Sequence, residues 1–99
     1  VLAAGTQPGL EVKDVEGKWH QVSCDPGMLV VNIGDMLELV SDKYYPSTTH
    51  KVSNPSKKLE KKSRYSMPLF LHPKDDVVLS SSYTAKSFLD ERLREIGLK

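Results

Sequence analysis

Frequent turn signals are the feature that most constrains how this chain folds. "TQPG" (6–9), "DVEG" (14–17) and "DPG" (25–27) combine glycine with proline or aspartate, as turns do. The segments between the turns are short and rich in Val, Leu and Thr, which favours strands. Only the tail of the chain changes to a helical period. Short strands followed by one closing helix predict a single, mainly β domain, built as a sandwich or barrel.

The expected strands follow from apolar patterning. "LEVKDVEGKWHQV" (10–22) predicts a hairpin, and "MLVVNIG" (28–34) is a nearly continuous apolar run that predicts a strand covered on both faces. Three more strands are expected at 47–54, 64–73 and 75–80, with Pro68 indicating an edge or a bulge in the second of them. An open set of such strands leaves edges uncovered. We therefore expect either a dimer or a missing upstream half.

Two helices are expected. Asp35 with Glu38 three residues later resembles a capping box, which predicts a short helix over 35–41. "TAKSFLDERLREIG" (84–97) predicts a C-terminal helix capped by Thr84 and ended by Gly97. Its apolar stripe indicates packing, and Tyr83 with Phe88 fits a hydrophobic staple. The stripe consists of Phe88, Leu89, Leu93 and Ile96.

Composition argues against several classes of partner. The net charge is +1, so no strong field indicates nucleic acid or a membrane. The basic run "KKLEKK" (57–62) contains no aromatic residue and is typical of a solvated loop. Cys24 is the only cysteine, which excludes an intrachain disulfide and favours a cytoplasmic location. No apolar run approaches the roughly 20 residues of a membrane span, and no signal peptide is visible.

Two sets of residues could carry chemistry. Arg64 and Ser66 are two apart, so on a strand they would share a face and could hold a carboxylate. Pairing of Arg64 with a surface acid, with Ser66 facing water, is the alternative. His50 could be structural, exposed or a metal ligand, since one histidine does not make a metal site. His20 and His72 have no companion ligand at metal spacing, and no His-x-Asp or His-x-Glu motif occurs.

Three motifs together resemble one family. "PGMLVVNIGDMLE", "YPSTTHKVSNP" and "RYSMPLFL" follow one another in this chain. In this order they are similar to the C-terminal part of the isopenicillin N synthase-like family of iron(II)- and 2-oxoglutarate-dependent dioxygenases. The resemblance implies the C-terminal half of a double-stranded β-helix (jelly roll), with a short internal helix and a C-terminal α-helix. Residues 1–99 would then be a partial catalytic domain.

The resemblance also implies roles for individual residues. His50 matches the distal histidine of the family's iron site, and Arg64 and Ser66 match the Arg-x-Ser pair that binds the 5-carboxylate of 2-oxoglutarate. Asn32 matches an asparagine on a strand that lines the site, although it could instead satisfy backbone groups. Apolar lining is conceivable for Phe70 and Leu71, but we expect both to pack in the core. Those two are not assigned to the site.

The implied reaction oxidises a small organic substrate and decarboxylates 2-oxoglutarate to succinate. Its cofactors would be Fe(II), 2-oxoglutarate and O2, with ascorbate as a candidate reductant. The family's His-x-Asp motif and a tyrosine that helps to bind the oxoacid would precede this chain. We therefore expect residues 1–99 to be inactive alone and to need the upstream half of the same polypeptide.

Two other functions stay open at this point. A jelly-roll domain without a complete iron site would serve as a non-catalytic binding or oligomerisation module. A nucleic-acid binder built on the basic loop is the weakest candidate, because that loop lacks stacking aromatics. A His-x-Asp segment encoded upstream of Val1 would favour the enzyme over the binding module.

Overall fold

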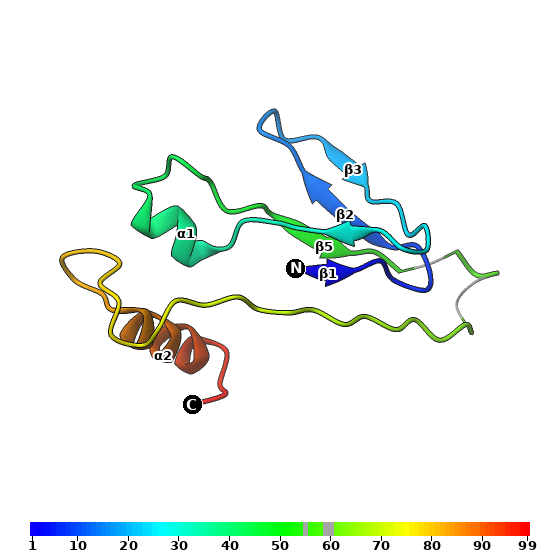
Figure 1. The fold of residues 1–99 in the computed structure, drawn as a ribbon. Coiled ribbons are helices and arrows are strands. Elements are labelled where there is room, and N and C mark those ends of the chain that lie inside the picture. The colour runs from blue at the N-terminus through cyan, green and yellow to red at the C-terminus, as the bar shows by residue number, and fades with distance from the viewer. Residues whose placement is uncertain (55, 59–60) are drawn as a thin grey trace. The chain divides into compact units, whose positions relative to one another are not determined.

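The computed structural model describes all residues except 55, 59 and 60. The described residues divide into two compact units. Unit 1 comprises 1–32 and 48–70, and unit 2 comprises 33–47 and 71–99. Part of the predicted basic loop at 57–62 lies outside the described residues. The elements, labelled in Figure 1, are β1 (Leu2–Ala3), β2 (Leu10–Lys13), β3 (Trp19–Gln21), β4 (Leu29–Val30), α1 (Asp35–Val40), β5 (His50–Val52) and α2 (Ala85–Glu95).

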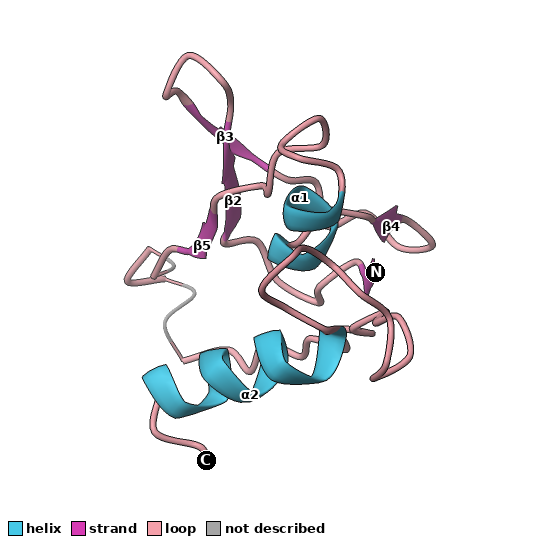
Figure 2. Ribbon diagram, turned by 90° about the vertical axis from the view of Figure 1, so that its left-hand side faces the viewer, coloured by secondary structure: helices cyan, strands magenta, loops and turns pink. Residues whose placement is uncertain are grey.

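The larger sheet of unit 1 contains three antiparallel strands in the order β3-β2-β5 (Figure 2). Val12 in the central strand β2 lies opposite His20 in β3 and His50 in β5. Side chains of residues directly opposite one another share a face of the sheet. His20, Val12 and His50 therefore form one row across this sheet.

The hairpin between β2 and β3 confirms the sequence prediction. Its turn is organised by Asp14, whose Oδ1 accepts hydrogen bonds from the backbone N–H groups of Glu16 and Lys18, both at 2.9 Å. Gly17 has φ +86°, a left-handed conformation that glycine adopts without steric cost. The local chemistry of "DVEGK" therefore sets the register of the hairpin.

The smaller sheet of unit 1 pairs β1 with β4, and Leu2 also bridges to Pro68. The backbones of Val1 and Leu69 exchange hydrogen bonds of 2.7 and 2.9 Å beside this bridge. The prediction of a long strand over 64–73 is wrong, because within the described chain this stretch has only that bridge. Pro68 has no N–H with which to continue a ladder. The predicted strand at 75–80 is likewise reduced to a bridge between Val78 and Thr84.

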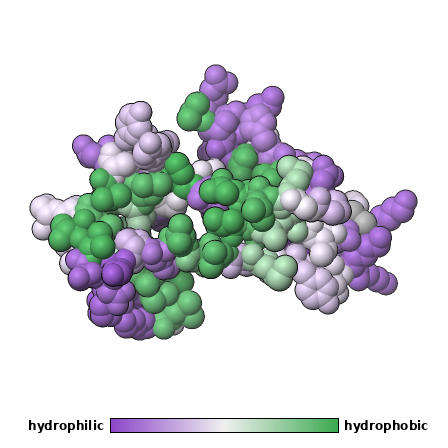
Figure 3. All heavy atoms as spheres, viewed as in Figure 1, coloured by the Kyte–Doolittle hydropathy of each residue, from purple (hydrophilic) through white to green (hydrophobic). Residues whose placement is uncertain are grey.

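The apolar run 28–34 is not covered as predicted. Only Leu29 and Val30 form strand pairs, and the side chains of Leu29 and Val31 are 67% and 73% exposed. Figure 3 shows many apolar residues at the surface of the protein. The expectation of coverage on both faces is therefore wrong for the residues that the structure describes.

Helix α1 lies inside the predicted range 35–41 but is capped differently. Its N-cap is Gly34, without a side-chain cap, so the predicted Asp35–Glu38 capping box is wrong. The Glu38 carboxylate instead accepts a hydrogen bond of 2.6 Å from the backbone N–H of Ser47. Glu38 thus connects α1 to Ser47, the last residue of the segment 33–47, rather than capping the start of the helix.

Helix α2 has the terminal structures that the sequence predicts. Thr84 and Ser87 form a capping box, and the rings of Tyr83 and Phe88 pack edge to face at 5.5 Å. Gly97 has φ +77°, and the N–H of Leu98 reaches the carbonyl of the residue five positions before it in a Schellman motif. The buried apolar core of the described chain lies in unit 2 and consists of Leu79, Ala85 and Phe88.

The predicted apolar stripe of α2 is shorter than expected. Phe88 is buried and Leu93 is partly buried, whereas Ile96 is 68% exposed. None of the helices in the described part of the chain is long and apolar enough to span a bilayer.

Candidate functional site

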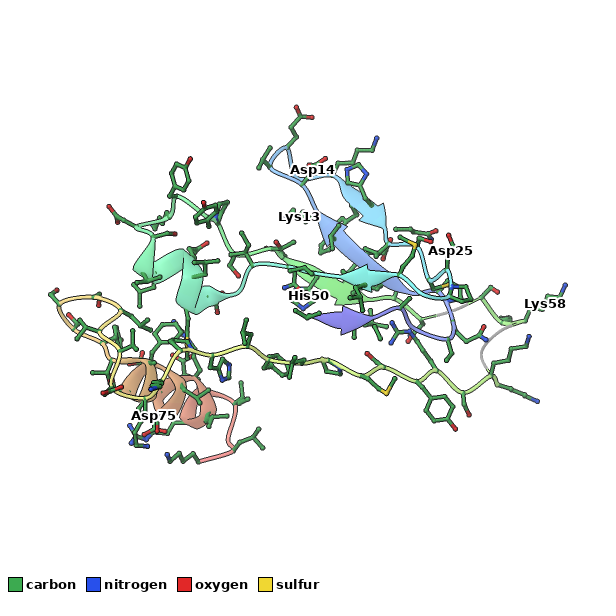
Figure 4. The ribbon with its side chains drawn as sticks, in the orientation of Figure 1. Lys13, Asp14, Asp25, His50, Lys58 and Asp75 are labelled. Carbon is green, nitrogen blue, oxygen red and sulfur yellow. The ribbon has the colours of Figure 1, made fainter. Side chains whose placement is uncertain are left out.

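The four candidate site residues all belong to unit 1. His50 opens strand β5, and Asn32 follows β4 (Figure 4 labels His50). Arg64 and Ser66 lie in the extended segment before the Leu2–Pro68 bridge. One unit therefore contains every residue that the sequence predicted for the site, although His50 is the one of the four that lies within a described strand.

The imidazole of His50 has a defined orientation. Its Nδ1 lies 2.8 Å from the backbone carbonyl oxygen of Thr48. A carbonyl oxygen only accepts hydrogen bonds, so Nδ1 carries a proton, and in the neutral imidazole the lone pair is then on Nε2. His50 is an exposed residue. Neutral imidazole with a free Nε2 is the form that binds a metal, and a carbonyl partner on the other nitrogen is typical of metal-ligating histidines.

The second histidine of the row has an acidic partner that the sequence analysis missed. His20 Nε2 lies 2.7 Å from Asp14 Oδ2, and this hydrogen bond holds the pKa of the Asp14 carboxyl below its usual value. The backbone N–H of Lys18 adds to the shift. The hairpin register could have revealed the pair, because Asp14 is two residues after Val12, which lies opposite His20. No group of three His, Cys, Asp or Glu residues suited to a metal occurs in the part of the chain that is described.

Arg64 is half-buried and fixed by the backbone. Its Nε donates a hydrogen bond of 3.3 Å to the carbonyl oxygen of Gln7. The remaining donors of the guanidinium, Nη1 and Nη2, form the end of the planar fork that binds carboxylates. Ser66 is exposed, and no strand forms over residues 64–66. The shared face of Arg64 and Ser66 therefore stays a prediction.

The remaining predicted residues differ in their surroundings. Asn32 is exposed at the end of the first part of unit 1. The expectation that Phe70 and Leu71 pack in the core is wrong within the described chain, since they are 76% and 82% exposed. Cys24 is a partly buried free thiol.

Comparison with known proteins identifies the family. The profile of the 2OG-Fe(II) oxygenase superfamily matches residues 1–73. The chain belongs to the 2OG-Fe(II) oxygenase superfamily. The strand with His50 and the segment with Arg64 both lie inside the matched range, so the superfamily profile covers every predicted site residue.

Relatives of this oxygenase chain include plant enzymes. It is 38% identical over 84 residues to 2-oxoglutarate-dependent dioxygenase AOP3 of Arabidopsis thaliana, which is 85% of this chain and 19% of the relative. It is 38% identical over 81 residues to 2-oxoglutarate-dependent dioxygenase 11 of Oryza sativa subsp. japonica, which is 81% of this chain and 21% of the relative. The chain thus spans about a fifth of the length of these curated relatives.

Two solved crystal structures are similar to this chain in both sequence and fold. A crystal structure of a protein from Shewanella oneidensis, assigned as an oxygenase, is 50% identical with a TM-score of 0.80. The match covers 99% of this chain and 36% of that one. A protein from Caulobacter crescentus, assigned to the 2OG-Fe(II) oxygenase family, is 39% identical with a TM-score of 0.73, over 90% of this chain and 34% of that one.

Proposed function

We propose that residues 1–99 are part of the catalytic domain of an iron(II)- and 2-oxoglutarate-dependent dioxygenase that oxidises a small organic substrate. The two short sheets of unit 1 would belong to the C-terminal half of a double-stranded β-helix. The observation that carries the proposal is the 2.8 Å contact between His50 Nδ1 and the Thr48 carbonyl oxygen, in a chain of the 2OG-Fe(II) oxygenase superfamily. That contact leaves Nε2 of His50 as a metal donor.

This chain would supply one protein ligand to Fe(II). His50 would supply one imidazole, and the other protein ligands would come from a His-x-Asp segment elsewhere in a longer polypeptide. When bound, Fe(II) supplies the oxidative chemistry that couples decarboxylation of 2-oxoglutarate to oxidation of the substrate. The residues of this chain would hold and orient the metal and the oxoacid. The Thr48 carbonyl keeps the His50 proton on Nδ1.

Arg64 would bind the 5-carboxylate of 2-oxoglutarate. Because Nε is taken by the Gln7 carbonyl, the carboxylate would meet the guanidinium end-on through Nη1 and Nη2. The hydroxyl of Ser66 would add a hydrogen bond to the same carboxylate. Asn32 would line the site at the end of the strand that contains Leu29 and Val30.

A non-catalytic jelly-roll module is the second candidate. It is compatible with one observation, that the described residues contain no set of three metal-binding side chains. Such a protein would keep the fold and the apolar surfaces but would bind no iron. Iron binding by the full-length protein separates the two functions.

Decarboxylation of 2-oxoglutarate by the full-length protein, with Fe(II) and with or without ascorbate, tests the proposal. Arg64→Ala should weaken 2-oxoglutarate binding about 10- to 100-fold, because it removes a charge-assisted hydrogen-bonding fork worth roughly 1.5–3 kcal/mol. Fe(II) affinity should stay unchanged. Arg94→Ala, which removes an exposed arginine of unit 2, is the matched control. Equal 2-oxoglutarate affinity in Arg64→Ala and wild type would refute the assigned role of Arg64.

A further inference from the structure

The loop between β1 and β2 contacts Arg64 and its neighbour through two hydrogen bonds. The Gln7 carbonyl oxygen accepts from Arg64 Nε at 3.3 Å, and Thr6 Oγ1 accepts from the backbone N–H of Tyr65 at 3.0 Å. The first bond fixes the guanidinium plane, and the second fixes the backbone beside it. Gln7 thus holds the side chain of Arg64 and Thr6 holds the backbone of the next residue, although the chain separates Gln7 from Arg64 by 57 positions.

The lack of a side chain at Gly5 makes room for the guanidinium of Arg64. A Cβ built on Gly5 would lie 3.2 Å from Arg64 Nη2 and 3.5 Å from its Cζ. The first distance is shorter than an ordinary van der Waals contact. Arg64 would have to move by a few tenths of an ångström, yet its Nε is held by the Gln7 carbonyl. The absence of a side chain at Gly5 therefore allows Nη2 its present position.

We propose that residues 5–9 form a seat that positions Arg64 and that Gly5 is a positioning residue for oxoacid binding. The inference rests on the proposed function, because that function makes 2-oxoglutarate the ligand of Arg64. The seat would hold Nη1 and Nη2 as a pair aimed end-on at a carboxylate. A displacement of the fork by a few tenths of an ångström lengthens both hydrogen bonds at once, so affinity for the oxoacid depends on the size of the side chain at position 5.

Gly5→Ala in the full-length protein is the first test. Gly5 does not have a left-handed φ, so alanine adds a Cβ without backbone strain. We expect the KM and the Kd for 2-oxoglutarate to rise roughly three- to tenfold, with Fe(II) affinity and thermal midpoint unchanged, because about 1 Å of misplacement costs on the order of 100-fold. Gly5→Val should raise both constants further. Gly34→Ala is the matched control, since a Cβ there meets nothing within 4 Å.

Gly9 is unsuitable for this test. Its φ of +143° would strain any side chain, and its Cβ would lie 3.0 Å from the carbonyl oxygen of Ser53. A loss of affinity in Gly9→Ala could therefore come from the backbone. Gly5→Ala avoids both problems.

A double-mutant cycle separates positioning from a general structural effect. Lysine at position 64 lacks the Nη2 atom that the new Cβ would meet, so Gly5→Ala should have no further effect on 2-oxoglutarate affinity in an Arg64→Lys background. The seat is refuted if Gly5→Ala lowers affinity equally in both backgrounds, or leaves it unchanged where Arg64→Ala weakens it. If Arg64→Ala itself has no effect, the proposed role of Arg64 fails and the seat with it.

Thr6 provides an independent and smaller test. Thr6→Val keeps the side-chain shape but removes the acceptor for the Tyr65 N–H, and Thr6→Ser keeps the acceptor. We expect Thr6→Val to raise the KM for 2-oxoglutarate about twofold, since the bond is exposed, and Thr6→Ser to restore the wild-type value. A rise in KM that Thr6→Ser fails to reverse would contradict the role of this hydrogen bond.

Discussion

Units 1 and 2 differ in what holds them together. Unit 2 contains both helices and the buried apolar core, and its long helix is capped at both ends by its own residues. Unit 1 consists of strands of two to four residues, and it exposes large apolar side chains such as Leu29, Val31 and Val52. Yet unit 1 has all of the predicted site residues. In this chain, the unit with the local order is not the unit that contains the proposed site residues.

This difference is expected from the two kinds of secondary structure. A helix satisfies its backbone within itself and needs one apolar face covered. A strand depends on partners that lie far away in the sequence. Unit 1 therefore provides the positions of the proposed site residues, and it leaves large apolar side chains exposed. If the comparison holds, substitutions in unit 1 change ligand binding and substitutions in unit 2 change stability.

His50→Ala should give the largest effect and would show that unit 1 has the function. It removes the imidazole that would bind the metal through Nε2, so iron-dependent turnover should fall by more than about 100-fold. Loss of a residue that only orients a ligand would cost less. The thermal midpoint should stay unchanged, because the side chain is exposed. Turnover assays and thermal denaturation of the full-length protein measure the loss of activity and the thermal midpoint. His72→Ala in unit 2 is the control, and retained turnover in His50→Ala would mean that His50 is structural.

Phe88→Ala tests the other half of the comparison. Phe88 is 6% exposed and packs against Leu79, Ala85 and Tyr83, so truncation should lower the free energy of unfolding by about 3 kcal/mol. Urea denaturation measures this loss, and 2-oxoglutarate affinity at low temperature should stay unchanged. Ile96→Ala, on the same helix but 68% exposed, should cost less than about 0.5 kcal/mol. The separation of the units fails if Phe88→Ala weakens oxoacid binding as strongly as it lowers stability.

Thr84→Ala should have a smaller effect on unit 2. The Thr84 hydroxyl accepts the N–H of Ser87 at 3.2 Å and caps α2, so its removal should cost about 1 kcal/mol. Thr84→Ser keeps the acceptor and should restore most of the stability. Urea denaturation of the three proteins gives the comparison. If Thr84→Ala and Thr84→Ser lowered the free energy of unfolding equally, the methyl group of Thr84, and not its cap, would be the stabilising group.

The sequence predicts those parts of the fold whose signals are local. The β2–β3 hairpin follows from "DVEGK", and the caps of α2 follow from Thr84 and Gly97. The strand over 64–73 was overestimated, because its pairing depends on residues 1 and 2 at the other end of the described range. The capping box of α1 failed because the Glu38 carboxylate binds the Ser47 N–H nine residues later, which no local rule anticipates.

The candidate site was predicted from a different kind of signal, and its roles stay a prediction. Residue types and order pointed to His50, Arg64, Ser66 and Asn32 only through resemblance to a family, since the spacing alone left several alternatives open. The contact of Arg64 with Gln7 had no signal in the sequence, because it uses a backbone carbonyl 57 positions away. Backbone acceptors have no side chain that a motif could show. The geometry that orients the predicted residues therefore had to come from the structure.

The smallest expected effect is on the stability of the β2–β3 turn in unit 1, and it comes from the Asp14–His20 pair. The hydrogen bond from His20 holds the pKa of Asp14 below its usual value, so the carboxylate stabilises the folded hairpin above about pH 4. This stabilisation is lost as the pH falls through the lowered pKa, where Asp14 takes up a proton. Protection of the Glu16 and Lys18 amides from hydrogen exchange, corrected for intrinsic rates, should therefore decrease below about pH 4. Asp14→Asn does not titrate and should show flat protection over this range. A decrease that persists in Asp14→Asn would assign the pH dependence to another acid and would contradict the role of the Asp14 carboxylate.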